Sequence, residues 1–317
     1  MTSDCLLCIA GATASGKTRL AVKLADVIDG EIISADARQV YRKMDVGTGK
    51  DLDEYTIGTK KIPYHLIDIV DAGRRYDVYQ YQCDFQRVYQ DIVNRGKTPV
   101  LCGGSGMYLE AVLGNYALEH VPVDEEFRKQ IAQYSDEQLI RLLKQHKTLH
   151  NTSDITDRER LIRALEIALH SDHCQSSQRT SEFPLQYKLF YVFFERSVLR
   201  ERIALRLQQR LQNGLVEEVQ SLLDYGISSE DLCYYGLEYR FITQYLTGHT
   251  DYQTMVSTLT IAIGQFAKRQ QTWFRRMERK GFELITIDGS LSDEQKLKKI
   301  VLNCDLCDDC LNSDLSD

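Results

Sequence analysis

The stretch Gly11-Ala12-Thr13-Ala14-Ser15-Gly16-Lys17-Thr18 matches the pattern G-x-x-x-x-G-K-[ST]. It follows an apolar segment at 6–10 that predicts a strand, and it precedes a predicted helix that runs from Lys17 to about Val27. Glycines let backbone amides turn inward around a phosphate, and a helix N-terminus adds free N–H groups and a favourable dipole. Lys17 supplies a positive charge, and Thr18 can hold Mg²⁺. The loop therefore predicts a diphosphate or triphosphate site.

The rest of the chain continues this alternation of strands and helices. Short apolar runs predict strands at 31–34, 64–68, 99–102, 188–194 and 282–287, and 77–94 predicts a helix. Such alternation is typical of an α/β fold with a mostly parallel sheet covered on both faces. We therefore expect a P-loop NTPase-like parallel sheet core.

Residues 119–184 differ, because they are polar and helical and contain no convincing strand. Thr156 and Glu159 fit a capping box, with Thr156 as the N-cap of a helix that continues through Leu165. We expect a helical insertion domain here. The chain then divides into a first core part at 1–118, the insertion at 119–184 and a second core part at 185–317, which includes a basic helix and an acidic, Cys-containing tail.

Two further residues follow predicted strands. Asp36 comes after the strand at 31–34, and Ser105 comes after the strand at 99–102. Ligands of open α/β sheets bind at the carboxyl edge of the strands, and a carboxylate there can accept a proton or hold a metal. The alternatives are an ordinary loop or N-cap aspartate and a simple turn serine, and the spacing does not decide between them. The second strand ends in Gly103-Gly104-Ser105-Gly106 rather than in the Mg²⁺-binding Asp of many nucleotide hydrolases, which disfavours that class.

Two long helices carry regularly spaced cations. In the first, expected at 198–225, Arg202, Arg206 and Arg210 recur at four-residue steps. They form either a solvated charged face or a clamp on a diphosphate, which suits the planar donors of arginine. The second is expected at about 253–279. We predict a buried stripe in it that consists of Val256, Leu259, Ile263, Phe266, Gln270, Trp273 and Met277, and an exposed face that carries Lys268, Thr272, Arg275 and Arg279.

Composition and charge restrict the class of protein. The net charge of −7 argues against a nucleic-acid partner when it is taken alone, but six of the thirteen residues at 268–280 are basic and one is acidic. Nine scattered cysteines favour reduced thiols, and the sequence contains no bilayer-spanning apolar run and no signal-peptide pattern, so a cytoplasmic protein is expected. Cys304, Cys307 and Cys310 form C-x-x-C-x-x-C, for which a disordered tail is favoured over a metal site.

Taken together, these pieces resemble the tRNA dimethylallyltransferase family, also called isopentenylpyrophosphate:tRNA transferases. The resemblance spans about residues 6–280 in the family's order and spacing. Its segments are GATASGKT at 11–18, SADARQVYRKMDVGTGK at 34–50, YHLIDIVD at 64–71, GKTPVLCGGSGMYLEAVL at 96–113, DRERLIRALE at 157–166, RIALRLQQRLQNGLVEEV at 202–219 and AKRQQTWFRR at 267–276.

The resemblance implies a monomeric enzyme that takes dimethylallyl diphosphate and Mg²⁺ and grips a tRNA anticodon stem-loop. The acceptor would be the N6 amine of the adenine just 3′ of the anticodon, flipped out of its stack, in tRNAs that read codons beginning with U. Asp36 would be the general base, Ser105 would keep a hydroxyl where the family usually has Thr, and Lys17, Thr18 and Arg206 would hold the diphosphate. The implied tRNA contacts are Asp36, Ala37, Arg38, Gln39, Ser105, Arg128, Glu159, Arg160, Leu161, Ile162, Arg163, Tyr235, Gly236, Leu237, Glu238, Tyr239, Arg240, Lys268, Arg269, Gln270, Gln271, Thr272, Trp273, Phe274 and Arg275.

Three segments depart from the family pattern. Ala37-Arg38-Gln39 stands where S-M-Q is common, Gly47-Thr48-Gly49-Lys50-Asp51 stands for G-T-A-K-P, and Leu237-Glu238-Tyr239-Arg240 stands for I-G-Y-K or V-G-Y-R. These changes leave the choice of tRNA open more than the reaction. The alternatives are a small-molecule kinase that uses the loop for ATP, a prenyltransferase that acts on free AMP or ADP, and a non-catalytic RNA-binding protein.

Overall fold

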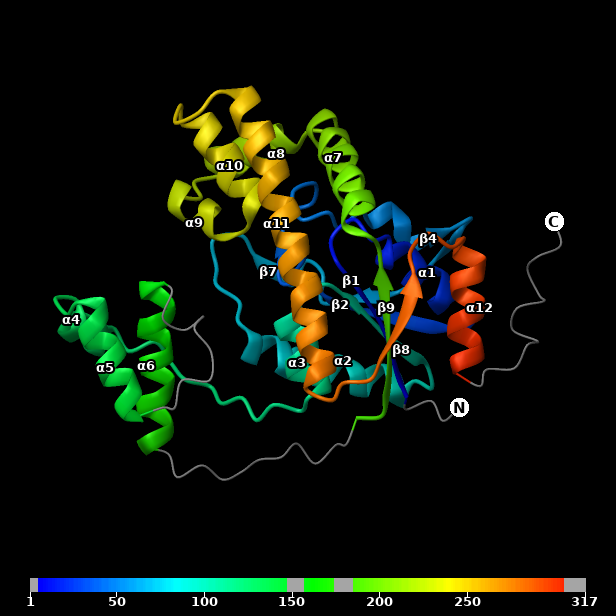
Figure 1. Ribbon diagram of the computed structural model, residues 1–317, viewed down its shortest axis with the longest axis horizontal. Helices are drawn as coiled ribbons and strands as arrows, with labels where there is room; N and C mark the ends of the chain where they lie inside the picture. Colours follow the sequence, from blue (N-terminus) through cyan, green and yellow to red (C-terminus); the bar gives the residue numbers. More distant parts are fainter. Residues whose placement is uncertain (1–4, 147–156, 174–184, 305–317) are drawn as a thin grey trace. The chain divides into compact units, whose positions relative to one another are not determined.

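The computed structural model describes residues 5–146, 157–173 and 185–304 of the chain (Figure 1). The contact pattern divides the chain into two compact units, one formed by 1–115 and 184–317 and the other by 116–183. The larger unit is built on a six-stranded sheet in the order β10-β9-β1-β8-β2-β6, in which every neighbouring pair is parallel. Its strands are β10 (Leu284–Asp288), β9 (Tyr187–Phe193), β1 (Leu6–Gly11), β8 (Thr98–Gly103), β2 (Gly30–Ala35) and β6 (Tyr64–His65).

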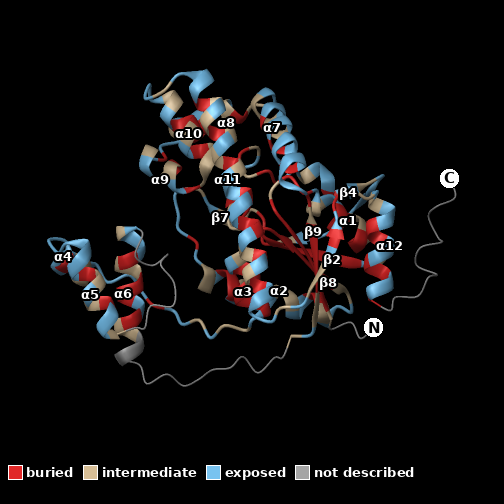
Figure 2. Ribbon diagram, viewed as in Figure 1, coloured by how far each residue is buried: buried red, intermediate tan, exposed pale blue. Residues whose placement is uncertain are grey.

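The central strands are buried on both faces. Every residue of β1 and β2 is buried, as expected for apolar runs in the middle of a parallel sheet (Figure 2). Helix α1 (Lys17–Val27) packs on β1, β2 and β8 and contacts α12 (Asp293–Asn303). Helices α2 (Val78–Asn94) and α3 (Gly106–Leu113) lie on the opposite face from α1, and α11 (Tyr252–Arg279) contacts α3 (Figure 1). The predicted α/β fold with a parallel sheet is therefore confirmed.

A helical layer follows β9. It comprises α7 (Arg196–Gln212), α8 (Leu215–Asp224), α9 (Ser229–Tyr234), α10 (Leu237–Leu246) and α11. The short elements of this unit are β3 (Tyr41–Arg42), paired with β7 (Val70–Asp71), β4 (Thr56–Ile57), paired with β5 (Lys60–Lys61), and the 3-10 turn η1 (Leu52–Tyr55). No helix in the described ranges combines the length and apolarity needed to cross a bilayer.

The smaller unit consists of α4 (Glu125–Ile131), α5 (Asp136–His146) and α6 (Arg158–His173) around its own apolar cluster. Glu166 of α6 is 4% exposed at the edge of this cluster and accepts from the Arg128 guanidinium, with Nε–Oε1 at 2.7 Å. The predicted N-cap Thr156 lies outside the described residues. Instead, Asp157 Oδ1 accepts from the N–H groups of Glu159 and Arg160 at 2.9 and 3.2 Å, so the cap falls one residue later than predicted.

Three boundaries predicted from the sequence are wrong, each for a local reason. The helix expected at 198–225 is two helices, α7 and α8, because Gly214 adopts a left-handed φ of 88° between them. The strand expected at 64–68 ends at His65, because Leu66 and Asp68 have positive φ. The two cysteines Cys307 and Cys310 of the tail motif lie outside the described residues, and Cys304 is buried at the end of α12.

The buried stripe of α11 is also shifted from the prediction. Phe266 is 40% exposed and Val256 and Trp273 are only partly buried, whereas Met255, Ala267 and Phe274 are buried. The stripe drifts around the helix because 3.6 residues per turn does not match a constant step of three or four. The expected exposed face is confirmed, because Lys268, Thr272, Arg275 and Arg279 are all exposed.

A buried carboxylate at the amino end of β2 gives the fold a pH-dependent contribution. Glu31 is 5% exposed, and its hydrogen bonds with Arg95 lower its pKa to about 2, although burial opposes the shift; His65 Nε2 adds a contact at 2.7 Å. A lowered folded-state pKa means that this contribution is complete above about pH 4.5, the unfolded value, and is lost as pH falls towards 2.

We therefore expect Glu31→Gln to lower the free energy of unfolding by about 1–3 kcal/mol at pH 7. The difference between variant and wild type should shrink between about pH 4.5 and 2, where the wild-type carboxylate also becomes protonated. Urea unfolding at several pH values measures this. A difference that stays constant down to pH 2.5 would contradict the assignment of the stabilising charge to Glu31.

Candidate active site

The glycine-rich loop at 11–18 connects β1 to α1, as predicted, with Gly16 as the left-handed N-cap of the helix. Lys17 is half-buried and makes no hydrogen bond or ion pair with the described part of the chain. Burial lowers the pKa of Lys17, the nearby Asp36 carboxylate opposes the shift, and Arg206 and Arg210 add to it. A half-buried cation beside two arginines is electrostatically suited to an anionic ligand.

Two side chains from later helices hold the loop in place. Gln270 of α11 is buried, accepts from the Thr13 N–H at 2.8 Å and donates from Nε2 to the Gly104 carbonyl at 2.9 Å. Arg202 of α7 donates from Nε to the Ala14 carbonyl at 2.8 Å. Gln270, which the resemblance implied as a tRNA contact, therefore bridges the glycine-rich loop and the loop after β8.

Asp36 and Ser105 lie at the carboxyl ends of neighbouring strands. Ala35 of β2 is paired with Gly103 of β8, and β8 lies directly beside β1. Ser105 Oγ accepts from the Ala37 N–H at 3.0 Å, and Asp36 Oδ1 accepts from the Arg38 N–H at 2.9 Å. The sheet order therefore brings Asp36, Ser105 and Lys17 to one edge of the sheet.

The three arginines of α7 differ in their surroundings. Arg202 contacts the loop carbonyl and lies over the Phe194 ring, with its guanidinium carbon 4.7 Å from the ring centroid. Arg206 is half-buried and pairs with Asp51. Burial lowers the pKa of Arg210, whose Nη1 lies 3.6 Å from a carboxylate oxygen of Glu238. Glu238, one of the departures from the family pattern, therefore faces an arginine within the fold.

The residues implied as tRNA contacts divide into exposed and buried groups. Tyr235 and Tyr239 are each 1% exposed, and their hydroxyls donate to the Arg74 carbonyl and to Glu218, so these two side chains pack within the fold. On α11, Gln270, Gln271 and Phe274 are buried, whereas Lys268, Arg269, Thr272 and Arg275 are exposed. Trp273 is half-buried beside Gly106, where an added Cβ would lie 2.3 Å from the indole ring.

The same division holds within the insertion. Arg163 joins Arg128 on the buried Glu166, with Nη1–Oε2 at 2.9 Å, and it also donates to the Val121 carbonyl at 2.6 Å. Leu161 is buried, and Glu159 and Arg160 are exposed. A tRNA contact through this helix would therefore begin from its exposed residues, with the two arginines already engaged.

Sequence reasoning missed several residues that shape this region. Tyr234 lies under the guanidinium of Arg75, 3.6 Å from the ring centroid, and Arg38 lies 5.1 Å from the same ring. Lys50 and Glu218 hold the segment that faces Arg206 and Arg210. Lys50 and Glu218 both stand inside the quoted motif segments, so a signal existed, but no periodicity indicated their partners.

The parallel sheet, the glycine-rich loop between β1 and α1 and the cations that face it define a protein of the phosphate-loop α/β class. More narrowly, the chain belongs to the IPP transferase family, whose model matches residues 39–277. The family resemblance seen in the sequence is therefore confirmed.

Named relatives extend over nearly the whole chain. It is 49% identical to tRNA dimethylallyltransferase 1 of Parabacteroides distasonis over 94% of this chain and 96% of the relative. It is 50% identical to tRNA dimethylallyltransferase 2 of Phocaeicola vulgatus over 93% and 96%. The solved structure of the full-length tRNA isopentenylpyrophosphate transferase from Bacillus halodurans is similar, with a TM-score of 0.68, 30% identity and 97% coverage of both chains.

Proposed function

We propose that the protein transfers a dimethylallyl group from dimethylallyl diphosphate to the N6 amine of the adenine just 3′ of the anticodon, in tRNAs that read codons beginning with U. We further propose that it acts as a monomer in the cytoplasm. The observation that carries this is the meeting of Asp36, Ser105 and the unpartnered Lys17 at one sheet edge, in a chain whose family and curated relatives are tRNA prenyltransferases.

The chemistry follows from these placements. The amides of the glycine-rich loop, Lys17 and Arg206 would bind the diphosphate and stabilise its charge as it departs. Asp36 would accept the N6 proton while the N6–C1 bond forms and the C1–O bond to diphosphate breaks. The products are N6-(dimethylallyl)adenosine, diphosphate and a protonated Asp36, which returns its proton to water. Ser105 would orient the amine or the Asp36 loop through its hydroxyl.

Mg²⁺ is the proposed cofactor. Thr18 offers a hydroxyl oxygen beside Lys17 at the start of α1, and oxygen ligands are those that Mg²⁺ prefers. Within the described ranges no group of three or more His, Cys, Asp or Glu side chains is arranged to hold a metal ion. A bound Mg²⁺ would therefore take most of its ligands from the diphosphate and water, and it would neutralise the charge of the leaving group.

The direct test is transfer of label. Purified protein, Mg²⁺ and radiolabelled dimethylallyl diphosphate are incubated with an unmodified tRNA that has an A-rich anticodon loop, and in parallel with AMP. Label in the tRNA at the adenine 3′ of the anticodon is expected. Label in AMP alone would establish the small-molecule transferase, and phosphorylation of a metabolite by ATP with no prenyl transfer would establish a kinase.

The exposed cations of α11 are the proposed contacts for the phosphate backbone of the tRNA. Replacing Lys268, Arg269 and Arg275 together with alanine should weaken tRNA binding by about tenfold or more. It should also lower the slope of log K against log salt by about 2–3, because each lost phosphate contact releases about one counterion fewer. Titrations of labelled tRNA at several salt concentrations measure both quantities.

The matched control removes two exposed cations elsewhere, Lys298 and Lys299 of α12. This pair should leave both the affinity and the slope unchanged. Equal losses in the two variants would mean that net charge, rather than the face of α11, determines tRNA binding.

A further inference from the structure

The segment from Met44 to Asp51, here named the 44–51 loop, is anchored to α8 by a single carboxylate. Glu218 accepts from three successive backbone N–H groups, those of Asp45, Val46 and Gly47, at 2.7, 2.7 and 2.9 Å. The Tyr239 hydroxyl donates to the same carboxylate at 2.7 Å. Four donors on one carboxylate fix both the position and the orientation of this end of the loop.

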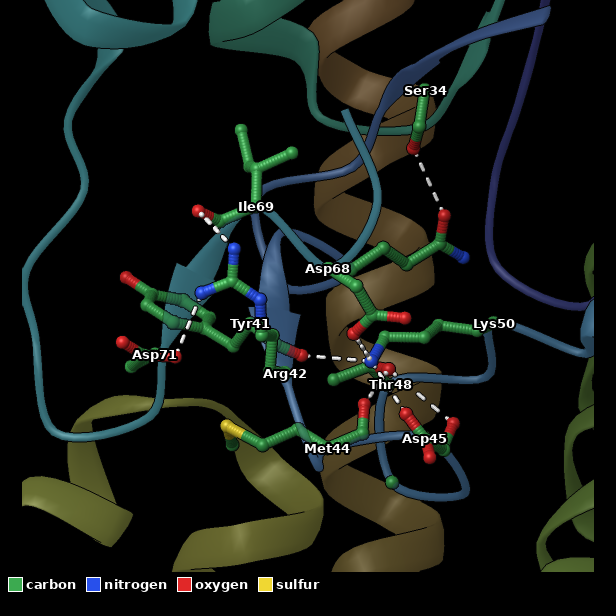
Figure 3. A network of polar contacts seen from close by, with 12 residues as sticks. Ser34, Tyr41, Arg42, Met44, Asp45, Thr48, Lys50, Asp68, Ile69 and Asp71 are labelled. Carbon is green, nitrogen blue, oxygen red and sulfur yellow. Dashed lines mark hydrogen bonds and ion pairs between the residues drawn. The ribbon is translucent and has the colours of Figure 1, made fainter. Parts of the chain in front are cut away.

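The other end of the loop is anchored by a buried cation. The Lys50 side chain is fully buried, and its ammonium donates to the Tyr41 carbonyl at 2.7 Å and pairs with Asp45 and Asp68 (Figure 3). Three oxygens therefore satisfy the three donors of the ammonium. Since a buried ion pair is weak evidence for stability, the fixed geometry of the loop is the more informative consequence.

Between these anchors the loop faces the cations of α7. Gly49 has a left-handed φ of 63°, and a Cβ added there would lie 1.6 Å from Arg210 Nη2 and 2.8 Å from Arg206 Nη2. Asp51 pairs with Arg206. Gln39, which follows Asp36 on the chain, donates to the Gly49 carbonyl at 3.0 Å, so the loop also contacts the segment that carries the proposed base.

These contacts connect two residues outside the proposed catalytic group with the arginines inside it. We infer that Lys50 and Glu218 are positioning residues, which fix the 44–51 loop so that Arg206 and Arg210 are held in place for the diphosphate of the donor. This rests on the proposed function in one respect, the assignment of Arg206 to the diphosphate. Asp51 occupies Arg206 in the free enzyme, and the diphosphate would replace it there.

The probe is inorganic diphosphate with Mg²⁺, titrated calorimetrically into wild type, Lys50→Met, Glu218→Gln and Arg206→Ala. Each variant should bind diphosphate at least tenfold more weakly. Each double variant that includes Arg206→Ala should lose clearly less than the product of the single losses, because both changes remove the same interaction. Steady-state assays should show a raised KM for dimethylallyl diphosphate and an unchanged KM for tRNA.

Arg95→Met is the matched control, because it also breaks a cation's contact with a buried carboxylate, Glu31, at the other end of β2. It should lower the melting temperature without changing diphosphate affinity. Lys50→Met is measured at a temperature where circular dichroism shows it folded. If it does not fold, Glu218→Gln and Asp68→Asn take its place.

The outcomes separate this inference from the proposed function. Folded Lys50 and Glu218 variants that bind diphosphate like wild type, or losses that simply multiply with Arg206→Ala, would overturn the positioning role. A wild type that binds diphosphate but transfers no prenyl group would reject the function while the binding data still decide the inference. A wild type that does not bind diphosphate would reject both.

Discussion

Asp36→Asn should lower the rate of prenyl transfer by about 10²–10⁴-fold, the usual contribution of a general base. Asparagine keeps the shape of the side chain, and its carbonyl oxygen can still accept from the Arg38 N–H at 2.9 Å, so the loop should stay in place. What the variant loses is the oxygen that can take a proton from the adenine amine. Single-turnover rates with saturating tRNA and donor measure the chemical step separately from binding.

The control for this experiment is Asp71→Asn, which changes an exposed carboxylate on β7 that pairs with Arg42. It should transfer the prenyl group at the wild-type rate. The diphosphate affinity of Asp36→Asn should be unchanged or slightly higher, because the variant loses a negative charge near Lys17. A single-turnover rate within threefold of wild type would remove Asp36 from the role of base.

The parts of the fold that were predictable from the sequence are those that depend on local pattern. The loop at 11–18 is recognisable because its glycines, Lys17 and the flanking strand and helix all lie within about twenty residues. The sheet followed from short apolar runs, since parallel strands buried on both faces need no polar alternation. The break at Gly214 was missed although Asn213-Gly214 is a turn signal, because the charged pattern on both sides continues the helix.

The remaining parts of the site depend on contacts between residues far apart in the chain. Gln270 bonds to Thr13 across 257 positions, and Glu218 bonds to Val46 across 172. Neither residue stands out by spacing or composition, because a side-chain contact with the backbone of a distant loop imposes no periodicity on the sequence around it. Gln270 was consequently grouped with the exposed residues of α11, although it is buried at the glycine-rich loop.

Lys17→Met should reduce prenyl transfer by at least about 10²–10³-fold, the cost of removing one preorganised group that stabilises a developing charge. It should also weaken the binding of inorganic diphosphate. In the free enzyme the Lys17 ammonium has no partner among the described residues, and burial lowers its pKa. Methionine removes this unfavourable charge and retains the length of the chain, so the variant should be as stable as wild type or more stable.

Lys50 provides the opposite case within the same protein. Its ammonium is surrounded by Asp45, Asp68 and the Tyr41 carbonyl, so Lys50→Met leaves those oxygens without their cation and should cost about 3–5 kcal/mol of stability. Thermal unfolding of the two variants side by side therefore distinguishes a lysine reserved for ligand from one that holds the fold. A drop in melting temperature for Lys17→Met equal to that for Lys50→Met would show that Lys17 is bound within the free enzyme, and its proposed role as the open diphosphate ligand would fail.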